Sequence, residues 1–377
     1  MAHFEDTTMA PSQELPPFVP CVTFASELPN ALKEHRIGPL IDERQLQRRL
    51  YYGIEILPRT ENHPVCLNFS RFLPVLPLFV SVAWLGRSSW FVEPVGQVES
   101  LQLAKHLAPR IPVMPHLTLY RLSEERLDQF LDLKFRNVLA LRGDEIYPSQ
   151  SFRYSKDIVV KAKARSKDKM SVCVGGFPEG YNRPKGMPPN ITLHLKFLKE
   201  KVDAGADCII TQVCYQHETI IDYVKKVREA GITVPILIGI TTYETYKKYK
   251  TIERLQGARL KPQLYKKLVK MNNEFLEDPR KNPYQIREFF IELYIHLICQ
   301  ILKSKIEVFG FQIFTLNNLG ATAALLQELH KQHLFDEKLP EVCKPLDSNL
   351  MDSDSSRKRT GLKRHSNLRL NHYYGKG

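Results

Sequence analysis

The chain has 377 residues, of which 43% are hydrophobic and 25% are charged, with 54 Lys or Arg against 41 Asp or Glu. This composition is typical of a globular protein and provides enough apolar residues for a full core. The formal net charge is +13, and the +9 that remains on the body after the basic tail is counted favours anionic small molecules over cationic ones. At about 150 residues per domain the length suggests two or three domains. One large domain with tails fits as well, because α/β barrels reach about 250 residues or more as one unit.

The first 48 residues are predicted to form a disordered leader. Residues 1–20 contain Glu5, Asp6 and Glu14 and no apolar core, which argues against a secretory signal or an Arg-rich transit peptide. The longest apolar run, 72–86, is shorter than the roughly 20 residues of a membrane helix and is interrupted by prolines. We therefore expect a cytoplasmic protein without a membrane span.

Eight short apolar runs alternate with stretches of helical spacing between residues 51 and 334. They predict strands at 52–57, 78–84, 111–117, 137–141, 171–176, 207–213, 234–240 and 308–316. Asn190 is a predicted helix N-cap, and two helices are predicted to end at Ala204-Gly205 and Ala230-Gly231. The Lys-rich stretch 241–283 is longer than one crossover needs and predicts an extra helix on the rim.

Strands that are apolar on both faces and alternate with helices predict a parallel sheet covered by helices. Eight repeats favour a closed (β/α)8 TIM barrel over residues 49–340. An open doubly wound sheet is the alternative, but its Gly-x-Gly-x-x-Gly turn is absent, and so is a P-loop motif.

Residues 341–377 are predicted to form a disordered basic tail. Its part from 345 to 377 carries seven Lys or Arg against three Asp and shows no apolar period. A solvated tail is the simplest interpretation, and contact with nucleic acid, an anionic surface or an import receptor is the alternative. The seven cysteines include no Cys-x-x-Cys pair, so we expect reduced, mostly buried thiols and no metal site.

Polar residues at the carboxyl ends of the predicted strands indicate a common site, because these ends open onto one mouth of a barrel. Glu55 lies between Ile54 and Ile56 on a predicted central strand, so burial should raise its pKa and make it a general acid. The alternative is an inward Glu paired with Arg142 or another cation. Asp144 is a second carboxylate at the same mouth and suits a different protonation role.

Six segments of the chain resemble, in order and spacing, the catalytic domain of methylenetetrahydrofolate reductase. They are 55–60 (Glu-Ile-Leu-Pro-Arg-Thr), 115–118 (Pro-His-Leu-Thr), 139–144 (Leu-Ala-Leu-Arg-Gly-Asp), 177–180 (Phe-Pro-Glu-Gly), 201–212 (Lys-Val-Asp-Ala-Gly-Ala-Asp through Ile-Thr-Gln) and 314–317 (Phe-Thr-Leu-Asn). The resemblance covers roughly residues 51–334 and implies a TIM barrel.

The resemblance implies an oxidoreductase that binds FAD, uses NADPH or NADH, and reduces 5,10-methylenetetrahydrofolate to 5-methyltetrahydrofolate in one-carbon and methionine metabolism. It assigns Glu55 as the acid that protonates the folate, Asp144 as a catalytic carboxylate that also borders the flavin, and Gln212 and Thr315 as substrate contacts. The cofactor contacts that it implies, with Asp144, are Trp84, His116, Thr118, Leu141, Arg142, Gly143, Tyr154, Phe177 and Lys201. A homo-oligomer is compatible with this assignment.

Four residues depart from the pattern of the family. Ala83 stands where a Thr is common, Tyr181 replaces a His, His194 replaces a ribose-binding Asp, and Asn318 replaces an Arg. Each change alters a polar contact, which is worth about 1 kcal/mol for a neutral hydrogen bond. The alternative hypothesis is therefore a diverged paralogue with weakened or lost flavin binding that acts as a binding or regulatory scaffold.

Overall fold

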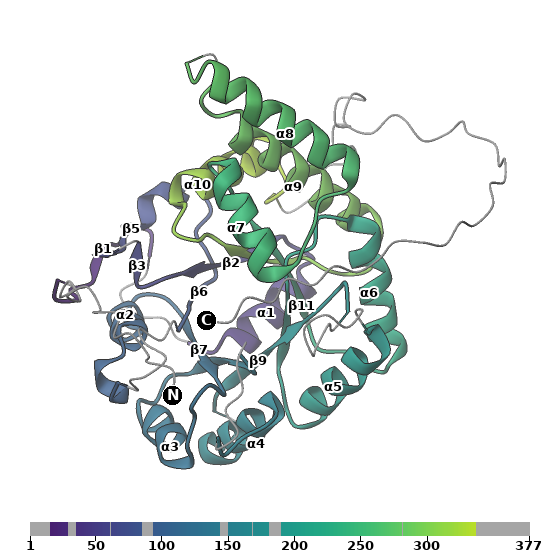
Figure 1. Cartoon of the computed structure of the whole chain (residues 1–377). Helices are drawn as coiled ribbons and strands as arrows, with labels where there is room; N and C mark the ends of the chain where they lie inside the picture. Colours follow the sequence, from purple (N-terminus) through teal and green to yellow (C-terminus); the bar gives the residue numbers. More distant parts are fainter. Residues whose placement is uncertain are drawn as a thin grey trace, which may run out of the picture. The chain divides into compact units, whose positions relative to one another are not determined.

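The computed structural model describes residues 16–28, 35–60, 62–84, 93–143, 150–167, 169–180, 190–280 and 282–336. A closed barrel of parallel strands forms its centre (Figure 1). The strands are β2 (Tyr51–Ile56), β6 (Phe79–Val82), β7 (Val113–Thr118), β8 (Asn137–Leu141), β9 (Ser171–Gly176), β10 (Cys208–Thr211), β11 (Ile236–Thr241) and β12 (Gly310–Phe314). Each strand pairs with the next, and β12 pairs with β2 to close the ring. The predicted TIM barrel and its eight strands are confirmed.

Helices cover the outside of the barrel (Figure 1). They are α2 (Glu99–Leu107), α3 (Glu124–Asp132), α4 (Ser155–Ser166), α5 (Ile191–Asp203), α6 (His217–Glu229), α9 (Gln285–Lys303) and α10 (Leu319–Lys331). The predicted cap of α5 is confirmed, because the side chain of Asn190 accepts a hydrogen bond from the Leu193 amide at 2.8 Å. Gly205 and Gly231 follow α5 and α6 with φ of +106° and +71°, which is the left-handed geometry of a helix C-terminus.

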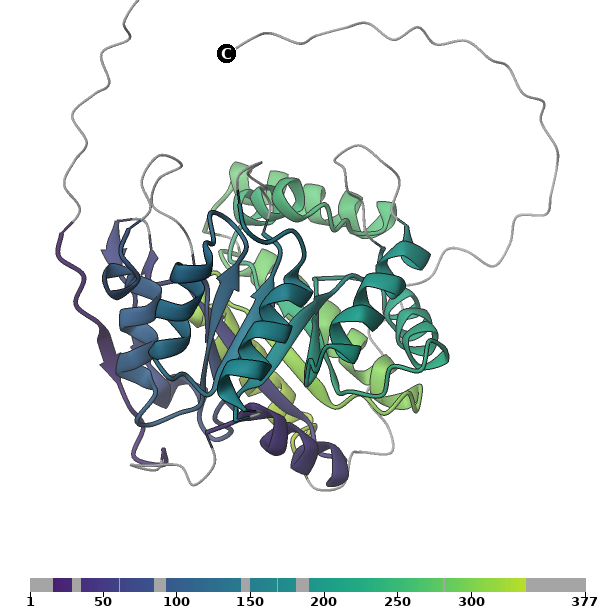
Figure 2. The same ribbon diagram turned by 90° about the horizontal axis from the view of Figure 1, so that it is seen from below.

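The Lys-rich insertion contains two helices where the sequence predicts one, α7 (Tyr246–Gln256) and α8 (Pro262–Glu277). The Phe290 ring of α9 lies 5.5 Å from Tyr249 of α7 and 4.5 Å from Tyr243, which precedes α7. In Figure 2, α8 lies at the opposite end of the strands from α1 (Ile37–Leu46). Among the described helices, none combines the length and apolarity needed to cross a bilayer.

Helix α1 closes the amino-terminal end of the barrel. The amides of Ile37 and Gly38 donate to the side chains of Asn137 at 2.7 Å and Ser171 at 3.1 Å, which begin β8 and β9. Ile37 and Ile41 are fully buried in the core that fills the barrel interior. The prediction of a disordered leader up to residue 48 is therefore wrong for α1, because an apolar barrel interior needs a cover at this end.

A second part of the predicted leader is also ordered. The strand β1 (Cys21–Thr23) pairs in parallel with β5 (Cys66–Asn68) beside the barrel (Figure 1). The small elements near it are β3 (Arg59–Thr60), β4 (His63–Pro64), and the 3-10 turns η1 (Phe69–Phe72) and η2 (Val95–Gln97). The Arg59 guanidinium holds this region together, because it donates to the Pro16 carbonyl at 2.7 Å and pairs with Glu99 at 2.8 Å.

The expectation of reduced thiols is wrong for one pair of cysteines. Cys173 on β9 and Cys208 on β10 are in-register neighbours whose Cα atoms are 4.8 Å apart, and the structure joins them by a disulfide. In-register residues of parallel strands point to the same face, a relationship that their separation of 35 residues in the sequence does not show. Cys214 and Cys299 are buried, as expected, whereas Cys21 and Cys66 are exposed.

Candidate active site

Glu55 lies near the carboxyl end of β2 with its side chain 14% exposed. Its in-register neighbours are Ser81 on β6 and Phe314 on β12. Burial raises the pKa of the carboxyl from 4.5 to about 8, because the charged form would lose its hydration. The predicted rise is confirmed, and Glu55 carries a proton at neutral pH.

His116 lies opposite Glu55. Its Nε2 is 3.4 Å from Oε2 of Glu55 but does not meet the geometry of a hydrogen bond, and this nitrogen is buried without a hydrogen-bond partner among the described residues. Burial lowers the pKa of the imidazole to about 3. The two side chains therefore form an uncharged pair, and His116 provides a polar atom at the mouth without a positive charge.

A polar layer that the sequence did not predict lies beneath Glu55. Nε2 of Gln312 donates to Oγ of Ser81 at 2.9 Å, and both residues are almost completely buried. Oε1 of Gln312 is buried without a partner among the described residues. A polar residue inside the apolar run 308–316 was the available signal, since the same signal identified Glu55.

The end of β12 fixes the backbone around Glu55. The Thr315 hydroxyl donates to the Glu55 carbonyl at 2.6 Å and is fully buried. Asn317 accepts from the Leu57 amide at 2.9 Å, and its Nδ2 donates to the carbonyls of Leu57 at 3.1 Å and Arg59 at 3.0 Å. Thr315, predicted as a substrate contact, thus donates its proton to the backbone of the acid's own strand.

The ends of β7, β8 and β9 form the neighbouring wall of the mouth. Gly143 has a φ of +81°, and a Cβ atom there would lie 3.4 Å from Cβ of Thr118. A Cβ atom on Gly175 would lie 3.6 Å from Leu141 and 3.9 Å from Phe177. The structure therefore brings together Thr118, Leu141, Gly143 and Phe177, all of which were predicted from the sequence. Arg142 is half-buried beside them.

The other predicted residues make contacts of their own. Gln212 directly follows β10, and its amide donates to the Gly176 carbonyl at the end of β9 at 2.8 Å. The Trp84 ring faces α3, with Phe130 at 6.4 Å and the Arg126 guanidinium at 5.2 Å. Tyr154 is 49% exposed at the start of α4 and packs against Phe197. Oε1 of Gln212 accepts from the amide of the following residue at 2.9 Å. Asp144 lies outside the described residues, so its position relative to Glu55 stays a prediction, and the same holds for Tyr181.

Lys201 and His194 connect α5 to the end of β9. Nζ of Lys201 donates to the Gly175 carbonyl at 2.9 Å, and burial lowers the pKa of this amine to about 8. Nε2 of His194 accepts from the Phe177 amide at 3.1 Å and lies 3.2 Å from the Tyr223 hydroxyl. Burial, with Lys201 nearby, lowers the pKa of His194 to about 3, so His194 is a neutral residue that supports β9.

Two other departures also have internal partners. The Ala83 carbonyl accepts from the Ser100 hydroxyl at 2.7 Å. Nδ2 of Asn318 donates to the Thr242 carbonyl at 3.3 Å, and its Oδ1 accepts from Nζ of Lys248 on α7. The side-chain amide of Asn318 thereby joins the start of α10 to the insertion and holds the Lys248 side chain beside it.

The residues at the mouth fit a bound flavin at two points. The buried Nε2 of His116, next to the acid, has no hydrogen-bond partner among the described residues and can bond to a ligand. Gly143 has no side chain where β8 ends, and this lets a large ring approach the backbone beside Thr118. The fit is weaker at Lys201, because its ammonium already donates to Gly175.

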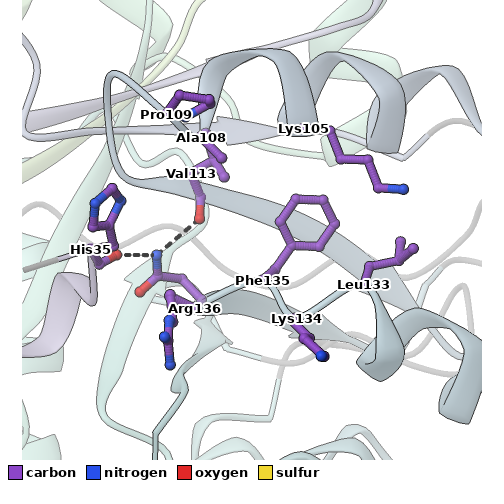
Figure 3. A pocket seen from close by; sticks show the side chains of 10 residues that line it. His35, Lys105, Ala108, Pro109, Val113, Leu133, Lys134, Phe135 and Arg136 are labelled. Carbon is purple, nitrogen blue, oxygen red and sulfur yellow. Dashed lines mark hydrogen bonds between the residues drawn. The ribbon is translucent and has the colours of Figure 1, made fainter. Parts of the chain in front are cut away.

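A cavity of about 290 Å³ lies at the other end of the barrel (Figure 3). It is lined by the first residues of β7 and β8, Val113 and Asn137, together with Phe135 and three basic side chains. The Asn137 amide is engaged there, because it donates to the carbonyls of His35 at 2.8 Å and Val113 at 2.9 Å (Figure 3). Because these are the amino-terminal ends of parallel strands and Glu55 lies near the carboxyl end of β2, this cavity is separate from the candidate site.

A family model for methylenetetrahydrofolate reductase matches residues 41–330. The chain belongs to the methylenetetrahydrofolate reductase family. Methylenetetrahydrofolate reductase 1 of Schizosaccharomyces pombe is 29% identical over 294 residues, which are 75% of this chain and 45% of that protein. Methylenetetrahydrofolate reductase 2 of Saccharomyces cerevisiae is 30% identical over 272 residues, 68% of this chain and 42% of that protein. The chain spans less than half the length of these reductases.

One solved structure has a similar fold. It is described as an uncharacterized protein from Clostridium thermocellum that binds two copies of 5-methyl-5,6,7,8-tetrahydrofolic acid. Its TM-score is 0.51 at 16% identity, and the match covers 77% of this chain and 99% of that one. At this identity the likeness supports the barrel fold of the reductase family and no particular ligand.

Proposed function

We propose that the chain reduces 5,10-methylenetetrahydrofolate to 5-methyltetrahydrofolate with FAD as cofactor and NAD(P)H as reductant. The observation that carries this proposal is the position of Glu55, a protonated carboxyl at the mouth of a barrel that belongs to the reductase family. Relatives named for NADH and for NADPH both match this chain, so either nucleotide is compatible.

Glu55 has the chemistry that the folate half of the reaction requires. Its carboxyl proton moves to a ring nitrogen of the substrate, the bond from this nitrogen to the methylene carbon breaks, and the electron pair stays on the nitrogen. The methylene carbon is then an iminium that accepts a hydride. FAD, when bound and reduced by NAD(P)H, supplies that hydride.

The surrounding residues prepare this proton transfer. Thr315 holds the backbone of Glu55, and neutral His116 lies beside the carboxyl without adding a charge that would favour its ionisation. We propose that His116, Thr118, Leu141 and Gly143 border the flavin, and that half-buried Arg142 lies on the side of its phosphates. Asp144 and Gln212 are proposed to contact the folate.

The variant Glu55→Gln tests this proposal. The amide has the shape of the carboxylic acid but no acidic proton, so folate reduction should fall by at least about 100-fold. Reduction of the bound flavin by NAD(P)H should stay within a few-fold of the wild type, since that half-reaction needs no proton from Glu55. Stopped-flow absorbance measures both halves, and an equal loss in both would refute the assignment.

A diverged scaffold is the second candidate function, and the contacts of α5 favour it. His194 and Lys201 stand where flavin contacts are expected, yet both bond to the end of β9. If these bonds persist with ligands present, the protein binds FAD weakly and serves as a folate-binding or regulatory barrel. Calorimetric titration with FAD separates the two candidates, since micromolar or tighter binding supports the reductase.

A further inference from the structure

Two exposed cysteines lie side by side where the amino-terminal strand meets the barrel. Cys21 on β1 and Cys66 on β5 are in-register partners of a parallel pair, as are Thr23 and Asn68. Leu67, between Cys66 and Asn68 on β5, is buried, so the two cysteines occupy the opposite, solvent-facing side of the strand pair. A hydrogen bond between the two thiols raises the pKa of Cys21.

The relationship between these thiols repeats one found inside the barrel. Cys173 and Cys208 are also in-register neighbours on parallel strands, and at a Cα separation of 4.8 Å they form a disulfide. This separation lies within the range that a disulfide spans without moving the backbone. The difference is access, because Cys21 and Cys66 are exposed to solutes and the interior pair is buried.

We propose that Cys21 and Cys66 are a modification site, a dithiol that forms a reversible disulfide by exchange with small-molecule disulfides such as glutathione disulfide. The thiolate of one cysteine attacks the small disulfide and releases one thiol. The second cysteine then attacks the mixed disulfide and releases another. The protein loses two protons and two electrons, and the small disulfide is reduced to two thiols.

This disulfide fastens the amino-terminal segment to the loop that borders the candidate active site. Val65, next to Cys66, donates its amide to the Pro58 carbonyl at 2.9 Å. Asn317 holds the same loop through Leu57 and Arg59, directly after the strand of Glu55. Arg59 in turn binds the Pro16 carbonyl, so the disulfide and this contact fix residues 16–21 at both ends.

Peptide mapping of the full chain tests the proposal, and its result does not depend on reductase activity. The protein is equilibrated in glutathione buffers of increasing oxidised fraction, quenched with acid, alkylated and digested with trypsin without reduction. Cys21 and Cys66 fall in different tryptic peptides, 1–33 and 60–71, and each peptide contains one cysteine. As the buffer becomes more oxidising, we expect most of peptides 1–33 and 60–71 to be recovered as one disulfide-linked species. This species should disappear when dithiothreitol is added.

Two variants serve as controls. In Cys66→Ser, the remaining Cys21 should form a stable mixed disulfide with glutathione. In Cys21→Ser/Thr23→Cys, a thiol is present on the same strand but opposite Asn68, so the yield of the linked peptide should fall at least about tenfold at the same buffer composition. Separate glutathionylation of Cys21 and Cys66 in the wild type, or an equal yield in the shifted variant, would overturn the proposal.

Hydrogen exchange provides a second readout. Oxidation of the wild type should slow amide exchange in residues 16–23 and 62–68, with no change in Cys66→Ser. Unchanged exchange in the disulfide-linked wild type would contradict the anchoring role.

Discussion

Nε2 of His116 lies 3.4 Å from Oε2 of Glu55, and neither side chain is charged at neutral pH. Desolvation is the first cause of both pKa shifts, and it acts in opposite directions on an acid and a base. A positively charged His116 in the same place would lower the pKa of Glu55 and favour the loss of its proton. The neutral pair keeps this proton available for a substrate, which is the basis of the proposed acid catalysis.

The rate of folate reduction should therefore fall as the pH rises through about 8, because Glu55 loses its proton there. The loss should follow the titration of one group. The rate of flavin reduction by NAD(P)H should not show this decrease with rising pH, and it serves as the internal control. Stopped-flow rates across neutral and alkaline pH check the expectation, and a folate-reduction rate that stays constant through the alkaline range would contradict it.

The same carboxyl makes stability depend on pH. Its pKa is about 8 in the folded protein, above the ordinary value of 4.5. The free energy of unfolding therefore has the full contribution of this group below pH 4.5, and this contribution is lost as the pH rises through about 8. The slope is at most about 1.4 kcal/mol per pH unit.

The variant Glu55→Gln does not titrate and should lose less stability across this range than the wild type does. Urea unfolding at the acidic and alkaline ends, performed on both proteins, measures the difference. Parallel pH curves for the two proteins would show that Glu55 ionises as freely in the folded chain as in the unfolded chain.

Gly53 should not tolerate a side chain. A Cβ atom there would lie 2.3 Å from Cζ of Phe79 and 2.6 Å from Oε1 of Gln312, inside the barrel. Gly53→Ala should cost about 3 kcal/mol or more, because the close-packed interior must shift. Gly96→Ala is the matched control, since nothing lies within 4 Å of its added Cβ. Thermal unfolding compares the two, and equal melting temperatures would count against the packing described for the barrel.

The side chain of Asn317 should be required to hold the loop that follows Glu55 in its observed conformation. Asn317→Ala removes the bonds to Leu57 and Arg59 and places Ala at a φ of +58°, so we expect a loss of about 2–4 kcal/mol in the free energy of unfolding. Folate reduction should fall more than flavin reduction, since the loop borders the acid. Asn282→Ala, at an exposed turn, should change stability by less than about 0.5 kcal/mol. Denaturant unfolding that ranks the two variants equally would contradict this role.

The barrel itself could be predicted because its strands are short apolar runs separated by helices with clear caps such as Asn190. Glu55 was identifiable for the same reason, as a charge within such a run. Helix α1 was missed because it has ten residues, Pro39 in its first turn and charges near its end, and because its stability comes from the barrel end that it covers.

Contacts between segments that are distant in the sequence could not be predicted from it. The direction of Trp84 towards α3, the pairing of Cys173 with Cys208 and the bond from Thr315 to the Glu55 backbone all depend on strand register. Register follows from the way the whole barrel closes, and a single sequence does not show which residues become neighbours.

The absorbance spectrum of the purified chain after incubation with FAD and gel filtration tests the central claim most directly. The proposed reductase predicts a flavin band that co-elutes with the protein, bleaches on anaerobic addition of NADPH or NADH, and returns when 5,10-methylenetetrahydrofolate is added. A protein that elutes without the flavin band after incubation with excess FAD, or a reduced flavin that 5,10-methylenetetrahydrofolate does not reoxidise, would contradict it.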